Sequence, residues 1–195
     1  MRPADNPFSV SRQHELKYQF PKGDNWNLFM ARLEQKGWKG ALVGKKGTGK
    51  TTLLLEIREK LLERGFGVKN LFLNCEKRKF NRDELKLIAE STSENDIILF
   101  DGSEQMAWWH WYYFLWKVRK AKGLILTTHK PSKLPTILKT STHFECYKAM
   151  VQQLIEKHPD LQYLTTSERL HHLFEKYNGN MRLALRALYD QAMNH

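Results

Sequence analysis

The segment Gly44–Thr51 limits most strongly what this chain can fold into. It reads Gly-Lys-Lys-Gly-Thr-Gly-Lys-Thr and lies between a short apolar run at 40–43 and a helical pattern at 53–64. Its three glycines permit backbone conformations in which successive amide groups point inward, at the positive end of the following helix. The pattern G-x-x-x-x-G-K-[ST] between a strand and a helix therefore predicts a phosphate-binding loop in an α/β domain.

The chain thus resembles the P-loop NTPases, with the Walker A loop at Gly44–Thr51. The resemblance implies ATP and Mg²⁺ as cofactors, with Lys50 reaching the β- and γ-phosphates and the Thr51 hydroxyl ligating magnesium. Four apolar residues that end in Asp101 resemble the Walker B strand, whose carboxylate holds the magnesium shell. The nucleotide-binding residues implied by this resemblance are Gly44, Gly47, Thr48, Gly49, Lys50, Thr51 and Thr52.

Short apolar runs alternate with helical patterns along most of the chain. The runs lie at 40–43, 68–74, 97–100 and 124–128. The last two lack the alternation of a half-solvated sheet, which is typical of strands buried on both faces. We therefore predict an α/β fold, with a parallel five-stranded P-loop sheet, helices on both faces and a small C-terminal helical lid.

Changes of pattern give the domain boundaries. We predict an N-terminal arm at 1–22, a P-loop α/β ATPase core at 23–142 and a helical lid subdomain at 143–195. The helices carry three N-cap signals, which are Asp24 or Asn25, Asn81 with Glu84, and Thr165 with Glu168. The latter two pairs have the spacing of a capping box.

A nucleotide hydrolase needs a group that orients or deprotonates the attacking water. In many relatives a Glu directly after the Walker B Asp does this, but here Gly102 occupies that place. Two carboxylates can substitute: Glu104, three residues beyond Asp101, and Glu76, at the end of the second predicted strand. We favour Glu104, and slow or absent hydrolysis stays open.

Two further segments resemble the sensors of AAA+-type (ASCE) ATPases. The fourth predicted strand ends in Thr127 and Thr128, and we assign the polar residue that reads the γ-phosphate to Thr128 first and Thr127 second. Arg182 follows a glycine break at the start of the last predicted helix, where a cation opposes the helix dipole. A role of Arg182 toward the nucleotide is therefore expected, and His129 is a surface residue or a ligand contact.

The region where these families place an arginine finger, 130–148, contains no arginine. Ring assembly with catalysis in trans is thereby put in doubt. A monomeric or partner-activated switch fits this sequence better, and the oligomeric state stays undetermined.

Residues Trp108–Trp116 form an aromatic helix followed by four basic residues. At helical spacing its rings point in several directions, so no single core face buries them all. Three roles are open for the rings that the core does not bury. The lid or the arm covers them, a protein partner docks on them, or the bases of single-stranded nucleic acid stack on them. This helix is the candidate docking surface.

The charge of the chain indicates which class of partner it binds. The net charge is +11, and the pI is about 9.6. Such a balance favours polyanions, and DNA ranks first among nucleic acid and protein partners. The chain starts without the apolar stretch of a secretory signal and has no run long enough to span a membrane. Cys75 and Cys146 lack the neighbours of a zinc site, and we expect a cytoplasmic protein without membrane partners.

The predicted function is an ATP-binding and ATP-hydrolysing switch that controls its grip on a macromolecule. A protein-interaction switch with weak or no hydrolysis is the alternative. A small-molecule kinase ranks lower, because no acceptor-binding motif is visible. GTP is disfavoured against ATP, because no N-K-x-D segment follows the fourth strand.

Overall fold

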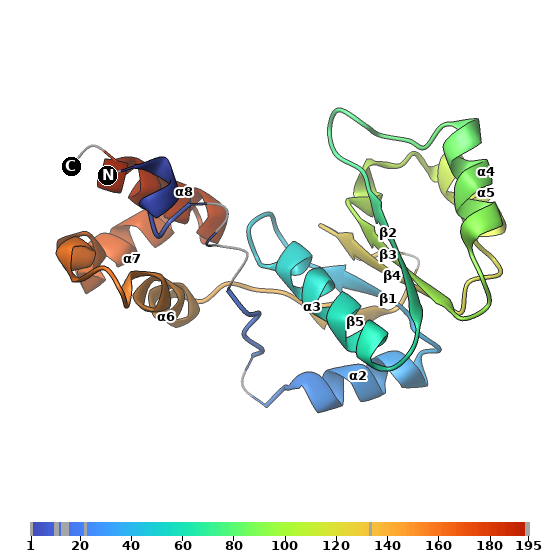
Figure 1. Ribbon diagram of the computed structural model, residues 1–195, viewed down its shortest axis with the longest axis horizontal. Helices are drawn as coiled ribbons and strands as arrows, with labels where there is room; N and C mark the ends of the chain where they lie inside the picture. The colour runs from blue at the N-terminus through green and yellow to red at the C-terminus, as the bar shows by residue number, and fades with distance from the viewer. Residues whose placement is uncertain (1, 10–11, 13–15, 22, 133, 194–195) are drawn as a thin grey trace. The chain divides into compact units, whose positions relative to one another are not determined.

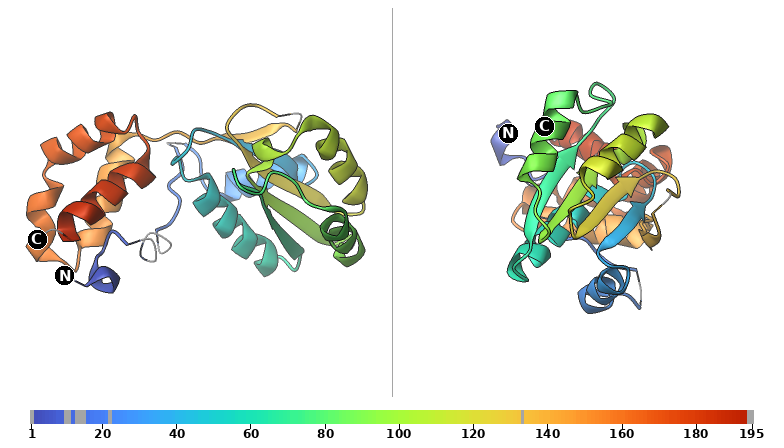
Figure 2. Two further views of the ribbon diagram at one scale, coloured as in Figure 1. Left: turned by 90° about the horizontal axis from the view of Figure 1, so that it is seen from above. Right: turned by 90° about the vertical axis from the view of Figure 1, so that its right-hand side faces the viewer.

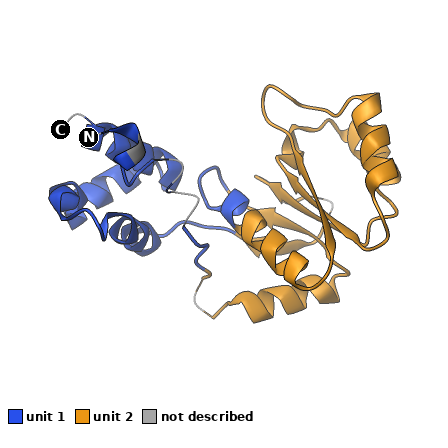
Figure 3. Cartoon of the chain, viewed as in Figure 1, with its two compact units in different colours: residues 1–19, 45–52, 140–195 blue, residues 20–44, 53–139 orange. Residues whose placement is uncertain are grey.

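The computed structural model describes residues 2–9, 12, 16–21, 23–132 and 134–193. The chain packs as two compact units, which Figure 3 colours separately. The sheet unit comprises residues 20–44 and 53–139, and the helical unit comprises residues 1–19, 45–52 and 140–195. The glycine-rich loop therefore groups with the arm and the C-terminal helices, whereas the sequence pattern assigned it to the core.

The sheet unit is built on five parallel strands in the order β2-β3-β4-β1-β5. The strands are β1 (Lys39–Val43), β2 (Gly67–Phe72), β3 (Asp96–Asp101), β4 (Gly123–Thr128) and β5 (Thr136–Lys139). β3 and β4 lie inside the sheet and are buried along almost their whole length, which accounts for their continuous apolar sequence. The α/β class and the parallel five-stranded sheet are thus confirmed. The sequence pattern did not locate β5, in which only Ile137 and Leu138 are buried.

Helices cover both faces of this sheet, as Figures 1 and 2 show. They are α2 (Trp26–Gln35), α3 (Lys50–Glu63), α4 (Arg82–Ser91) and α5 (Trp108–Lys117), with a short 3₁₀ helix η2 (Ser103–Gln105). Leu85 of α4 and Phe114 of α5 pack in one cluster with Phe100 of β3, and α3 buries its own apolar side on the other face. Both N-cap predictions in this unit are confirmed: Asn25 accepts from the Leu28 amide, and the capping box at the start of α4 is complete.

The connections that leave the neighbouring strands β1 and β4 run in opposite directions across the sheet, to β2 at one edge and to β5 at the other. From β1 the chain passes over one face to β2 at the sheet edge, and it returns through β3 to β4 over the other face. Ligands of open α/β sheets bind outside the carboxyl ends of the strands at such a reversal. The loop that begins at Gly44 and the residues that follow β3 and β4 leave from this position.

The helical unit has a core of its own. Its elements are η1 (Pro3–Asp5), α6 (Phe144–Ile155), the 3₁₀ helix η3 (Pro159–Thr165), α7 (Ser167–Lys176) and α8 (Met181–Met193). Phe8 of the N-terminal arm is buried in this core, in the same cluster as Tyr147. The Asn6 amide donates to the Tyr189 carbonyl oxygen at 3.1 Å, which fixes the start of the arm to α8.

The capping box predicted at Thr165 and Glu168 is wrong. Thr165 is the last residue of η3, and its hydroxyl donates to the Gln162 carbonyl oxygen at 3.0 Å. The N-cap of α7 is Thr166, whose side chain makes no capping hydrogen bond. A 3₁₀ turn directly before the helix uses the hydroxyl that the sequence pattern assigned to the cap.

Candidate functional site

The glycine-rich loop leaves β1 in a fixed conformation. The Gly44 amide donates to the Thr128 carbonyl oxygen at 3.1 Å, so the loop starts beside the end of β4. Gly47 and Gly49 have φ angles of 78° and 82°, which residues with a Cβ rarely adopt. The helix α3 then begins at Lys50, so the backbone amides of its first turn face the loop without intrahelical partners.

The side chains of the loop bond to the loop itself. The Lys50 Nζ and the Thr48 hydroxyl both donate to the Lys45 carbonyl oxygen at 2.8 Å. Lys50 and Thr48 are buried, whereas Thr51 is exposed at the start of α3 and Thr52 is half-buried. The lysine ammonium is therefore held at the positive end of a helix, where an anion gains from both charges.

Within the helical unit the loop contacts three other segments. A Cβ on Gly47 would collide with the Asn180 side chain, so this position requires glycine for space as well as for its φ angle. The Thr48 hydroxyl lies 2.6 Å from that of Thr140, and the Tyr18 ring lies against Gly49. The start of α8 and part of the arm therefore pack against the loop.

Arg182 lies in the first turn of α8, two residues after Asn180. The Asn180 Oδ1 accepts from the Leu183 amide at 3.3 Å and caps the helix. Arg182 is exposed, and no hydrogen bond or ion pair holds its guanidinium within the described ranges. Its charge is thus available to a ligand near the positive end of α8.

A second group of polar residues lies at the carboxyl edge of the sheet, in the sheet unit. The Thr127 hydroxyl donates to Asp101 Oδ1 and accepts from the Gly102 amide, and the Ser103 hydroxyl donates to the Thr127 carbonyl oxygen. β3 and β4 pair Phe100 with Leu126, so the next residues along both strands are Asp101 and Thr127.

The structure places Thr127, and not Thr128, beside Asp101. The Thr128 hydroxyl donates instead to the Lys130 carbonyl oxygen at 3.0 Å in the turn after β4. Adjacent residues of a strand point to opposite faces, which separates the two hydroxyls. Sequence alone could not choose between them, because the choice depends on the register between two strands.

Gly102 explains why no carboxylate follows Asp101 directly. Its φ angle is 79°, and a Cβ there would collide with the Leu73 carbonyl oxygen of the neighbouring chain segment. Glu104 lies two residues further, in η2, where its Oε1 is 3.4 Å from the Nε2 of His129. Glu76 is exposed in the loop after β2, and in the described structure its carboxylate has no hydrogen bond or ion pair.

The two residues predicted as magnesium ligands, Thr51 and Asp101, carry oxygen donors, the type that this ion prefers. Thr51 offers a hydroxyl at the start of α3, and Asp101 offers a carboxylate that the Thr127 hydroxyl orients. No group of three or more His, Cys, Asp or Glu side chains that could hold a metal occurs among the described residues. Magnesium needs no such group, because it is commonly held by one or two carboxylates together with phosphates and water.

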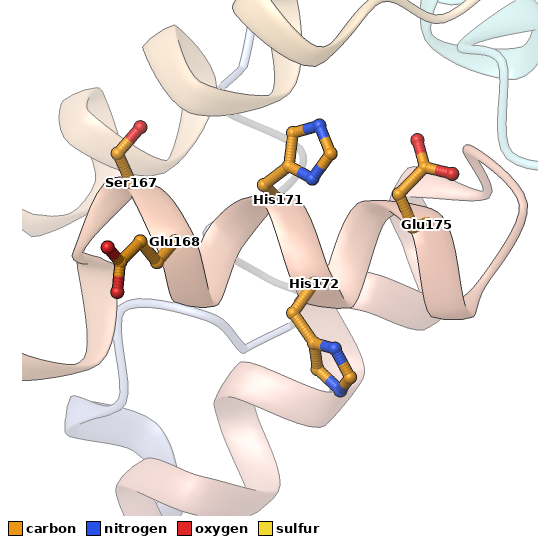
Figure 4. A pocket seen from close by; sticks show the side chains of 5 residues that line it. All are labelled: Ser167, Glu168, His171, His172 and Glu175. Carbon is orange, nitrogen blue, oxygen red and sulfur yellow. The ribbon is translucent and has the colours of Figure 1, made fainter.

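A shallow pocket lies elsewhere, on α7, and is lined by Ser167, Glu168, His171, His172 and Glu175. Figure 4 shows that His171 and His172 leave the helix in different directions, so the two imidazoles do not converge. The His171 ring meets the edge of the Phe144 ring at 5.0 Å between centroids. This arrangement is a packed helix surface and contains none of the predicted site residues.

No protein-family model matches the chain, and no curated protein matches it. Across the described residues, no helix combines the length and the apolar character needed to cross a membrane.

Proposed function

We propose that this chain is a magnesium-dependent, AAA+-like P-loop ATPase that uses nucleotide occupancy to control its grip on a macromolecule. The conformation of the glycine-rich loop carries the proposal. Gly47 and Gly49 adopt left-handed conformations directly before α3, and Lys50 is held beside the loop by the Lys45 carbonyl oxygen. A triphosphate offers charge-assisted hydrogen bonds to the lysine and the loop amides, and these are stronger than a bond to a neutral carbonyl oxygen.

Thr51 and Asp101 are the proposed magnesium ligands. When bound with ATP, the ion would neutralise charge that develops between the β- and γ-phosphates. The Thr127 hydroxyl bonds to one oxygen of Asp101 and holds the carboxylate in one orientation. Gly44, Gly47, Thr48, Gly49 and Thr52 complete the proposed nucleotide-binding segment.

Glu104 is the proposed acceptor for the proton of the attacking water. His129 contacts its carboxylate and keeps it directed, and thus acts as a positioning residue. Gly102 cannot be replaced by a carboxylate in this backbone, which supports a position further along the chain for the base. Glu76 has no such partner, which ranks it second.

The C-terminal segment 143–195 is the proposed lid. Asn180 contacts the glycine-rich loop within the helical unit, and Arg182 follows it in the first turn of α8. A cation at this end of a helix is unfavourable without an anion nearby, and a γ-phosphate would supply that anion. Nucleotide occupancy would thereby change the contact between loop and lid.

DNA ranks first as the macromolecular partner because of the net charge of +11. A protein-interaction switch with weak or no hydrolysis is the second candidate. One observation favours it: the residue after Asp101 is a glycine that sterically excludes any side chain.

The test is ATP turnover with magnesium, with and without single- and double-stranded DNA at low and moderate salt. Lys50→Ala should reduce turnover by at least about 100-fold, because it removes a charge at the phosphates. Lys60→Ala is the matched control, since it removes an exposed lysine from the far end of the same helix and should leave turnover unchanged. ATP binding without turnover in every condition would reject the hydrolase and leave the protein-interaction switch.

A further inference from the structure

The helix α5 is aromatic on two sides that differ in burial. Phe114 is fully buried, and it packs with Trp111 against Phe100 of β3. On the outer side five rings are between 42% and 68% exposed, and these are Trp108, Trp109, Tyr112, Tyr113 and Trp116. At 100° per residue these five positions fall within an arc of about 140°. They form one continuous surface, which we call the aromatic face.

Contacts between its rings hold the aromatic face in a defined arrangement. Trp108 and Trp109 meet edge to face at 5.6 Å between centroids. Tyr113 and Trp116 stack at 6.0 Å with an angle of 21° between their planes. Rings held in this way lose little conformational entropy when a flat ligand stacks on them.

Cations adjoin the same rings. The Lys117 Nζ lies 5.0 Å from the Trp116 centroid and 5.4 Å from the Tyr113 centroid, and the Arg119 guanidinium lies 5.2 Å from Trp116. Lys120 and Lys122 follow, and the stretch 107–122 contains no Asp or Glu. On the neighbouring α4, Glu84 and Glu90 are each paired with a lysine, and Asp83 is the one further acidic residue of that helix. The segment that carries the aromatic face is therefore positively charged.

We propose that the aromatic face of α5 binds single-stranded nucleic acid, with bases on the rings and phosphates at Lys117 and Arg119. The combination of stacking rings and neighbouring cations is what a single strand requires. From Trp108 to Trp116 the helix rises about 12 Å, which matches about three or four nucleotides. This inference rests on the proposed function, because the single strand would be the macromolecule that the proposed ATPase controls.

Other occupants fit the surface less well. A duplex keeps its base faces stacked inside and offers none to exposed indole rings. A helix that binds a bilayer surface buries Trp, Phe and Leu in it, whereas the exposed large apolar residues of α5 include neither Phe nor Leu. A protein partner would have to supply the acidic groups that the phosphates of a strand already carry.

The experiment measures binding of a fluorescein-labelled oligothymidylate of about 15 nucleotides, without ATP, by anisotropy and by quenching of tryptophan fluorescence. Trp109→Ala and Trp116→Ala should each raise the Kd by about 5-fold or more, because each removes a stacking ring. A plot of the logarithm of the association constant against the logarithm of salt concentration has a negative slope, and Lys117→Gln should reduce its magnitude by about one.

Phe72→Ala is the matched control. Phe72 is 59% exposed in the same unit, and its neighbour Leu71 packs on the α4 and α5 side of the sheet. Phe72 therefore points to the opposite face, and its removal should leave the Kd unchanged. All variants must keep the thermal midpoint of the wild type, so that a loss of binding is not a loss of fold.

Three results would overturn the inference. They are an unchanged Kd in both tryptophan variants, equal binding of a duplex of the same sequence, and quenching by anionic lipid vesicles but not by the oligonucleotide. Lys50→Ala separates this inference from the proposed function, because it should abolish turnover and keep oligonucleotide binding. ATP turnover without oligonucleotide binding would support the proposed ATPase function and reject the aromatic face as a site for single-stranded nucleic acid.

Discussion

The carboxyl edge of the sheet and the core of the helical unit differ in whether their polar side chains have hydrogen-bond partners. At the sheet edge, Asp101, Thr127 and Ser103 are joined by hydrogen bonds. In the helical unit, the Tyr147 ring is fully buried, and no described residue bonds its hydroxyl. Burial also raises the pKa of this phenol. At the sheet edge the strand register places hydrogen-bond partners next to each other. In the helical core the Tyr147 ring fills apolar space, and its hydroxyl is buried with the ring.

If the sheet edge is the chemical part of the molecule, its carboxylates should differ sharply in their effect on turnover. Glu104→Gln keeps the shape of the side chain but cannot accept a proton, and it should lower the ATP turnover rate by about 100-fold or more. Glu76→Gln changes an exposed carboxylate without partners and should stay within about two-fold of the wild type. A larger effect at Glu76 in the same steady-state assay would move the base to the loop after β2.

The steric demand at the sheet edge can be separated from the cost of a left-handed backbone. Gly102→Ala combines a φ angle of 79° with a collision against the Leu73 carbonyl oxygen, and should cost about 3 kcal/mol of stability. Gly65→Ala has a φ angle of 80° with nothing near its Cβ, and should cost about 1 to 2 kcal/mol. Urea unfolding measures both, and equal costs would show that the backbone relaxes away from Leu73.

Local signals in the sequence predicted what local geometry decides. The glycine-rich pattern located the loop, although α3 begins at Lys50, three residues before the predicted helical pattern. Asn25 and the Asn81 capping box located two further helix starts. The apolar runs predicted a buried parallel sheet because strands without a solvated face carry no alternation. The pattern failed at Thr165, where a preceding 3₁₀ turn competes for the same hydroxyl.

Long-range features were not predictable in the same way. The bond from Thr127 to Asp101 depends on the register of β3 and β4, and the contact between Gly47 and Asn180 joins segments far apart in the chain. The sequence placed His129 at the end of a strand but could not pair it with Glu104. The sequence showed that this helix is rich in aromatic residues. The packing of Phe114 against Phe100 was needed to show which of the rings are exposed.

Register also predicts which of two adjacent threonines matters for turnover. Thr127→Val removes the hydroxyl that orients Asp101 at nearly constant volume, and should lower the turnover rate by about ten-fold. Thr128→Val removes a bond to the Lys130 carbonyl oxygen in an adjoining turn and should have a smaller effect. The reverse order, at equal ATP affinity, would favour Thr128 as the residue that reads the γ-phosphate.

The smallest expected effect lies in the helical unit, and it has the opposite sign. Tyr147→Phe removes a buried hydroxyl without a partner and should raise stability by about 1 kcal/mol. Because burial raises the pKa of Tyr147, the wild type loses stability as pH rises above about 10, and the variant should lose less. Tyr113→Phe, at an exposed ring, is the control and should change the thermal midpoint little. A destabilised Tyr147→Phe would show that the hydroxyl has a partner in solution.

The position of β2 at the end of the strand order affects how copies of the protein behave at high concentration. In the described sheet β2 pairs only with β3, so the backbone amide and carbonyl groups on its outer edge have no partner strand. Such an open edge is a template for adding a further strand from another molecule. Lys69 lies on it, and the net charge of +11 repels a second copy. Added salt screens this repulsion, so aggregation during purification should increase with ionic strength.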